Sequence, residues 1–246
     1  MFLRVLSYNI HKAIGVDRRF DPARIIAILR HHEPDVVLLQ EVDRGAPRSG
    51  RLDLASHIAR ELGSYYYAGG MNVFLKEGRY GNATLSRWPI GRQRNIQLSR
   101  TEKIRRGAQH TRIHVRARGR ETDLDVFNLH LGLTGRARRR QVRRLLESPD
   151  IVSLKPEAPC IIAGDTNDWR GLLRRGLFEP AGFRCATNHG PASRWAIRTY
   201  PSFAPTGGLD KIFYRGGLQL LHAHRSRLAL ARVASDHLPI IAEFQI

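Results

Sequence analysis

Apolar and polar positions along the chain alternate with two different periods, which predicts interleaved strands and helices. Residues 2–8 alternate and are rich in large apolar side chains, and residues 35–41 form the continuous apolar run of a strand buried on both faces. Residues 21–35, between them, have helical spacing, with Asp21 as the N-cap and Pro22 at the first helical position. The chain therefore begins as strand, helix, strand.

The alternation continues toward the C-terminus. A second helix is predicted over residues 49–63, with Ser49 as its N-cap and Gly63 at its end, and a third over residues 134–148. Residues 65–118 are largely β in character. The strands predicted beyond the first two lie at residues 81–86, 95–99, 110–118, 122–132, 160–165, 209–215 and 238–246.

Length and composition narrow the class of protein. A chain of 246 residues can bury a sizeable core, and its apolar fraction of 42% favours a globular α/β protein. No repeat or low-complexity linker divides the sequence, so we expect one domain over residues 1–246. Cys160 and Cys185 are the only cysteines, which excludes a disulfide framework. Without a signal peptide or an apolar run of about 18 residues, we expect a cytoplasmic monomer with no transmembrane segment.

The formal net charge of +19 favours an anionic partner: nucleic acid, a phospholipid surface or a phosphorylated metabolite. Only five of the 41 basic residues are lysines, and the arginines are scattered from end to end. Such an arginine excess also arises from genome base composition, so charge alone does not identify the partner.

Polar side chains that can bind a metal or a phosphate stand at the predicted strand ends. They are Asn9, Glu41, His130, Asp165, Asn167, Asp210, Asp236 and His237. Carboxylate and amide oxygens are ligands for Mg²⁺ or Mn²⁺ rather than zinc, and the histidines match no zinc motif. Hydrolysis of a phosphate ester requires a cation, a base for water and donors for the transition state. The pattern therefore favours metal-dependent hydrolysis of a phosphoester.

Seven short motifs occur in order along the chain: SYNIHK, LLQEVD, YGNATLSR, NLHLG, GDTND, GGLDKIFYR and SDHLPI. Together they resemble the endonuclease/exonuclease/phosphatase family, whose superfamily includes DNase I, exonuclease III-type AP endonucleases, neutral sphingomyelinases and inositol polyphosphate 5-phosphatases. The resemblance extends from residue 3 to residue 244. It implies a DNase I-like four-layer α/β sandwich, with two mixed β-sheets face to face, helices outside and the site at one edge.

The resemblance also implies roles for these side chains. Asn9 and Glu41 would hold the metal, with Asp236 reaching it directly or through water. Gly164 would permit a tight turn at the end of its strand. The other five residues would act on the substrate: contact with the phosphate by His130 and Asn167, orientation or deprotonation of water by Asp165, and pairing of Asp210 with His237.

Each assignment has a structural alternative when its residue is considered alone. Asn9 could cap a turn, Asp165 could cap the following helix, and His130 could be a core histidine with satisfied hydrogen bonds. Membership of the ordered set favours the chemical role for these three. We interpret Asp168 as a capping group without a chemical role.

One motif departs from the DNase I-like pattern, in which a glutamate from the strand before YGNA pairs with the first catalytic histidine. Glu77 is the nearby glutamate, and its position is ambiguous, so we expect Asn82 to orient His130 or to contact substrate. Phosphate binding is then the role of His130, and the acid for the leaving group is unassigned.

Three basic regions are candidate substrate contacts outside the core. Arg105 and Arg106 precede a predicted strand, where they could clamp a flanking phosphate, and residues 134–148 carry six arginines. Residues 188–208 combine Arg194, Trp195, Arg198 and Tyr200, a set suited to stacking and phosphate contact. We expect a nuclease acting on DNA or RNA. The alternatives are a phosphodiesterase or phosphatase for phospholipid headgroups or small molecules, as in the sphingomyelinase-like branch, and a polyanion-binding protein without activity.

Overall fold

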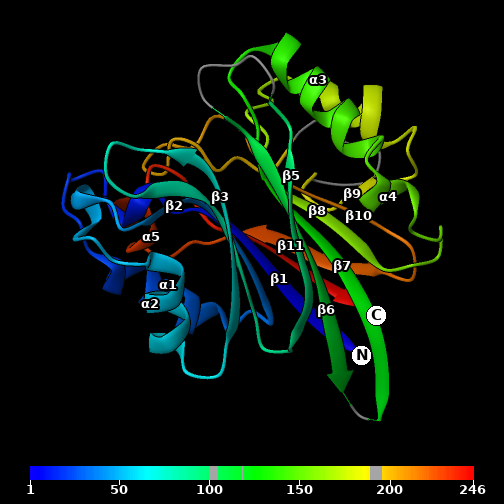
Figure 1. The fold of residues 1–246 in the computed structure, drawn as a ribbon, viewed down its shortest axis with the longest axis horizontal. Helices are drawn as coiled ribbons and strands as arrows, with labels where there is room; N and C mark the ends of the chain where they lie inside the picture. The colour runs from blue at the N-terminus through cyan, green and yellow to red at the C-terminus, as the bar shows by residue number, and fades with distance from the viewer. Residues whose placement is uncertain (100–104, 118, 189–195) are drawn as a thin grey trace.

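Two mixed β-sheets, packed face to face, form the centre of the protein (Figure 1). The structure is a computed structural model that describes residues 1–99, 105–117, 119–188 and 196–246. The first sheet has the order β11 (Gln219–Arg225), β12 (Ile240–Gln245), β1 (Phe2–Asn9), β2 (Val36–Arg44), β4 (Arg79–Ser86) and β3 (Tyr66–Phe74). The second has the order β5 (Ile90–Gln97), β6 (Gly107–Ala117), β7 (Arg120–His130), β8 (Cys160–Asp165), β10 (Asp210–Arg215) and β9 (Arg184–Cys185).

One central pair of strands in each sheet is parallel: β1 with β2 in the first sheet, and β7 with β8 in the second. Parallel neighbours end at the same edge of a sheet, so their last residues lie together. Asn9 pairs with Gln40 in the first sheet, and His130 pairs with Asp165 in the second. The strand ends predicted to carry the chemistry therefore meet in pairs.

Helices cover the outer faces of both sheets, as predicted (Figure 1). Apolar clusters lie between the sheets and under each helical layer, which gives the four layers of an α/β sandwich. No helix in the described ranges has both the length and the hydropathy of a transmembrane helix. The first sheet is covered by α1 (Pro22–His32), α2 (Leu54–Leu62) and α5 (Ala231–Ala234), the second by α3 (Gly135–Leu146), α4 (Pro149–Val152) and the π-helical segment η3 (Arg174–Phe178).

The first two helices begin at acidic caps. Asp21 accepts a hydrogen bond from the backbone N–H of Ala23 at 3.1 Å, as predicted. The N-cap prediction for α2 was wrong: Asp53, not Ser49, accepts from the N–H of Ser56 at 3.2 Å. Ser49 instead ends a short 3₁₀ turn, η2, so it lies too far before the first helical residue to cap it.

A layer of buried amides joins the two sheets behind the strand ends. The side chain of Gln40 donates to Asn128 Oδ1 at 2.8 Å, and Asn128 in turn donates to the carbonyl oxygens of Leu39 and Ala83 at 3.0 and 2.9 Å. Buried amides without partners are costly, so each bond constrains the register of one sheet against the other.

Gly164 lies within β8 and allows a close approach between strands, not the tight turn that we expected. Its φ of 141° is rare for L-residues, and a Cβ at this position would lie 1.9 Å from the carbonyl oxygen of Leu129 in β7. Because the next residues are His130 in β7 and Asp165 in β8, this contact sets the distance between two site residues.

Gly164→Ala is expected to destabilise the protein by about 3 kcal/mol, because the added Cβ meets backbone that cannot move aside. For a chain of this size, that corresponds to a drop in Tm of roughly 6–12 °C. Gly176→Ala is the matched control, since a Cβ there lies more than 4 Å from every described neighbour. Equal Tm values for the two variants by circular dichroism would contradict this account of the β7–β8 contact.

Candidate active site

A cavity of about 640 Å³ opens at one edge of the sandwich, where strands of both sheets end. The chain termini lie at the opposite end of the sheets, where the amine of Met1 donates to the carbonyl of Ile246 at 2.8 Å (Figure 1). We call this space the active-site cavity. The predicted residues that line it are Asn9, Glu41, His130, Asp165, Asn167, Asp236 and His237.

Asp165 stands at the centre of this group, and its side chain is 2% exposed. One oxygen accepts from the amide of Asn9 at 3.0 Å, and the other from the backbone N–H of Asn167 at 2.9 Å. The Nε2 atoms of His130 and His237 lie 3.5 and 3.6 Å from Asp165 Oδ2. Asp165 therefore connects side chains from both sheets.

His237 is paired with Asp210, which is fully buried at the start of β10. The imidazole Nδ1 donates to Asp210 Oδ2 at 2.9 Å, and the hydroxyl of Thr199 donates to the same oxygen. Burial lowers the pKa of His237, but Asp210, with Asp165 and Asp236, raises it to about 10. The imidazole is therefore cationic at neutral pH.

His130, in contrast, is in its neutral form at pH 7. Burial lowers the pKa of His130 to about 4, with help from Arg106 and against the charge of Asp165. His130 is thus neutral at pH 7 and His237 is charged, although both lie close to the same carboxylate. The two histidines are suited to different roles, since one can accept a proton and the other can donate to an anion.

The two residues that we considered as partners of His130 have different surroundings. Glu77 is half exposed and pairs with Arg51 at 2.5 Å. Asn82 is 2% exposed, and its amide donates to two backbone carbonyls, one of them that of Asn128 at 3.1 Å. Asn82 therefore belongs to the amide layer between the sheets, and it also lines a small cavity that His130 lines.

Glu41 is brought into the cavity by an irregularity in β2. The register with β4 shifts between Leu39 and Val42, and Glu41 has a φ of 58°, a strained conformation for this residue. Its carboxylate pairs with the ammonium of Lys12. Burial raises the pKa of Glu41, but the charges of His130 and Lys12 lower it to about 2. Glu41 is therefore ionised and adjacent to a cation.

Glu41 and Asp236 provide hard oxygen donors in the same cavity. Asn9 is turned differently: its amide nitrogen faces Asp165, and its oxygen accepts from the backbone N–H of His11 at 3.1 Å. Within the described residues, no three His, Cys, Asp or Glu side chains converge as a preformed metal cluster. Mg²⁺ retains several waters and needs only one or two carboxylates, so this donor set fits it.

Asn167 and Asp168 follow β8 and have different surroundings. Asn167 lines the cavity with a φ of 51°, and its amide donates to the carbonyl of Leu131 at 3.0 Å. Asp168 is buried and accepts from the backbone N–H of Leu173 at 2.8 Å, near the start of the following helical segment. That contact matches the structural role expected for Asp168.

Of the two arginines expected to clamp a phosphate, Arg106 lines the active-site cavity, and Arg105 is exposed beside a smaller adjoining cavity. Tyr200, expected as a substrate contact, also lines the active-site cavity. Sequence reasoning missed Lys12 and Tyr80 in the wall of this cavity. Lys12 ends the motif SYNIHK and Tyr80 begins the motif YGNATLSR, so their positions in these motifs could have identified them.

Of the residues predicted to contact substrate in the segment before β10, the structure describes Arg198 and Tyr200. Arg194 and Trp195 lie outside the described residues, and Arg198 lines a second cavity of about 430 Å³. This second cavity adjoins the active-site cavity, because Trp169 lines both.

Comparison with sequences of known proteins agrees with this geometry. Residues 6–237 match the profile of the endonuclease/exonuclease/phosphatase family. The chain is 31% identical to YbhP of Escherichia coli K12, which is described as uncharacterized, over 99% of this chain and 96% of YbhP.

Two crystal structures share the fold. An endonuclease/exonuclease/phosphatase from Beutenbergia cavernae DSM 12333 has a TM-score of 0.79 and 24% identity, covering 100% of this chain and 72% of that one. TDP2 of D. rerio, complexed with single-strand DNA product, has a TM-score of 0.77 and 20% identity, covering 100% of this chain and 99% of that one. Members of the matched family are hydrolases acting on phosphoesters. This chain belongs to the endonuclease/exonuclease/phosphatase family.

Proposed function

We propose that this protein is a divalent-metal-dependent phosphodiesterase that cleaves DNA or RNA. The observation that carries the proposal is the set of opposite charges across one cavity, where Arg106 and His237 accompany the carboxylates of Glu41 and Asp165. Hydrolysis of a phosphodiester needs both signs of charge, because the phosphate is anionic and the attacking water must lose a proton.

Arg106 supports a bound phosphate. Its side chain is 9% exposed, and its Nε has no hydrogen-bond partner among the described residues. A buried N–H group without an acceptor is unfavourable, and a phosphate oxygen would supply one. His237, held in its cationic form by Asp210, is the second donor for the charge that develops on phosphorus oxygens in the transition state.

Asp165 is the group that orients and deprotonates the attacking water. Its bonds from Asn9 and from the backbone of Asn167 align the carboxylate before substrate binds. His130 in its neutral form and Asn167 contact the phosphate. Each of these side chains ends or follows a strand, so the site is held by the rigid part of the fold.

Glu41 and Asp236 are the residues that would hold Mg²⁺ or Mn²⁺, because both present carboxylate oxygens to the cavity. The metal would neutralise phosphate charge as a Lewis acid. Lys12 pairs with Glu41 and compensates the charge of this carboxylate.

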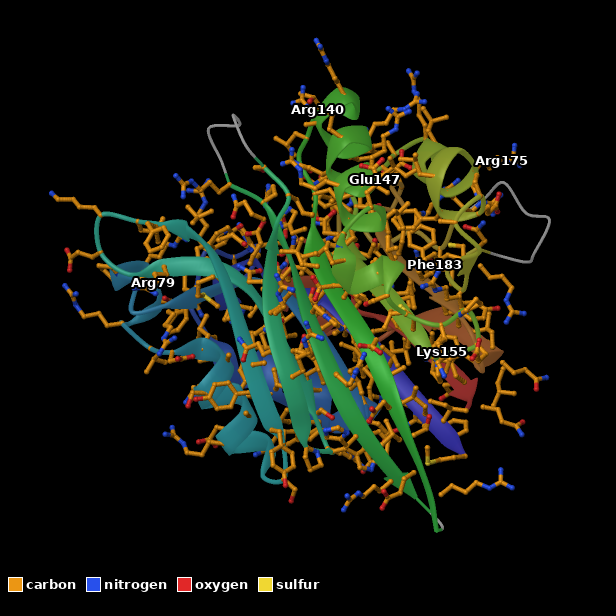
Figure 2. All side chains as sticks on the ribbon, turned by 45° about the vertical axis from the view of Figure 1, so that its right-hand side comes forward. Arg79, Arg140, Glu147, Lys155, Arg175 and Phe183 are labelled. Carbon is orange, nitrogen blue, oxygen red and sulfur yellow. The ribbon has the colours of Figure 1, made fainter. Side chains whose placement is uncertain are left out.

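Nucleic acid is favoured over other phosphoesters by the surface around the site. The net charge is +19, and exposed arginines lie along α3, with Arg175 exposed on η3; Arg140 and Arg175 are labelled in Figure 2. The indole of Trp169, 57% exposed at the cavity edge, can stack on a base. The complex of TDP2, a protein of the same fold, with single-strand DNA is consistent with this choice.

Chelation tests the metal. EDTA is expected to abolish hydrolysis of bis-p-nitrophenyl phosphate and of single-stranded oligonucleotides, and Mg²⁺ or Mn²⁺ to restore it. Glu41→Gln should raise the metal concentration for half-maximal activity by about tenfold or more, whereas Glu61→Gln on the surface of α2 should not change it. Activity that survives exhaustive chelation would refute the metal role of Glu41.

The Asp210–His237 pair is expected to act as one unit. His237→Ala should lower turnover by roughly two to four orders of magnitude, Asp210→Asn by much of the same amount, and the double variant little further. His222→Ala, an exposed histidine on β11, is the control. Each variant is assayed well below its own Tm, because losing His237 also leaves a buried carboxylate uncompensated. Wild-type turnover by folded His237→Ala would show that the mechanism is wrong.

Salt dependence tests the basic surface. Affinity for single-stranded DNA should fall steeply between about 50 and 200 mM salt, since each neutralised phosphate releases counterions. Replacing exposed Arg139 and Arg143 of α3 with alanine should reduce the slope of log K against log salt by about 1.4. Replacing Arg30 of α1 and Arg60 of α2 with alanine removes the same charge from the other side of the sandwich and should not change the slope. Identical slopes for the wild type and both double variants would show that α3 is a solvated surface that does not bind DNA.

A further inference from the structure

The second cavity is lined by cationic residues from three parts of the chain. Arg170 and Arg175 come from the segment after β8, Arg198 from the segment before β10, and Lys211 from β10 itself. No aspartate or glutamate occurs among the described residues that line it. Its electrostatic character therefore suits an anionic ligand.

Lys211 and Arg174 are buried cations of this cavity, and Arg174 is paired with Glu179 at 3.2 Å. Lys211 follows Asp210 in β10, and successive side chains in a strand point to opposite faces, so Asp210 contacts His237 while Lys211 faces the second cavity. Lys211 is 3% exposed. Burial lowers the pKa of Lys211, against the raising effect of Cys185 and Asp168. A buried ammonium in this state is unfavourable until an anion joins it.

Gly208 keeps space free beside that ammonium. A Cβ at Gly208 would lie 3.3 Å from Lys211 Nζ, 2.7 Å from the Cβ of Ala196 and 2.9 Å from the carbonyl oxygen of Ile197. The backbone therefore approaches Lys211 closely without a side chain between them.

Aromatic rings connect this space with the active-site cavity. Trp169 lies edge to face with Tyr200, with ring centroids 5.7 Å apart, and the Tyr200 ring lies 5.0 Å from that of His237. The exposed indole borders both cavities. A group bound near Lys211 and a phosphate bound near His237 would thus lie on either side of one stacking surface.

We propose that the second cavity is a subsite for a flanking nucleotide of the substrate, in which Lys211 and Arg198 bind its phosphate and Trp169 stacks on its base. This inference rests on the proposed function in taking nucleic acid as the substrate. The subsite adds one expectation to the proposed function: a substrate with a second phosphate next to the scissile one binds more tightly than a substrate with one phosphate.

The test is equilibrium binding in EDTA, so that turnover does not enter. The probes are the dinucleotide ApA and the same dinucleotide with an extra terminal phosphate at the 5′ or the 3′ end. Binding of each probe is measured by the quenching of tryptophan fluorescence. In the wild type, one of the phosphorylated forms should bind on the order of tenfold more tightly than ApA. Lys211→Gln should remove this preference, and the exposed variant Arg198→Gln should reduce it.

Lys155→Gln is the matched control, because Lys155 (labelled in Figure 2) is exposed and does not line this cavity. It should keep the full preference. Equal binding of all three probes by the wild type, or a preference that survives in Lys211→Gln, would overturn the subsite. Terminal-phosphate preference without hydrolysis of ApA in Mg²⁺ would instead contradict the proposed nuclease function and leave the subsite in place.

Discussion

The hydrogen bond between Asn9 and Asp165 is the contact on which the candidate active site depends. Asn9 ends β1 of the first sheet, Asp165 ends β8 of the second, and the two side chains meet at 3.0 Å. A carboxylate that is 2% exposed requires donors around it, and Asp165 also accepts from the backbone N–H of Asn167. Both histidines lie within 3.6 Å of the same carboxylate. The packing of the two sheets and the geometry of the site are thus a single constraint, supported from behind by the Gln40–Asn128 amide layer.

The same carboxylate explains how one cavity holds two histidines in different states. His237 has a second carboxylate, Asp210, directly bonded to its ring, and its pKa rises to about 10. His130 has no such partner among the described residues, and the pKa falls to about 4 because burial and Arg106 outweigh Asp165. The cavity therefore offers a cationic and a neutral imidazole at pH 7. In the proposed mechanism both contact the phosphate, His237 as a charged donor and His130 in its neutral form, while Asp165 activates the water.

Much of the fold could be predicted because its central elements have simple patterns. β2 and β8 are apolar runs buried on both faces, and α1 has a cap and an apolar stripe. β11 was missed because it is an edge strand whose sequence, QLLHAHR, mixes polar and apolar residues without a clear period. In the site, ordered motifs indicated the residues at strand ends. The bond of Asn82 to the backbone of β7 could not be predicted, because bonds between sheets depend on how the sheets pack, which no local pattern encodes.

The central claim, that Asp165 activates a water for attack on a phosphodiester, is tested most directly by single-turnover hydrolysis in ¹⁸O-labelled water. The account predicts that wild-type protein with Mg²⁺ places a single ¹⁸O atom on the phosphorus of the product. Asp165→Asn should react slower by roughly two to four orders of magnitude, while exposed Asp123→Asn reacts at the wild-type rate. Product phosphate without the label, or a folded Asp165→Asn that hydrolyses at the wild-type rate, would contradict it.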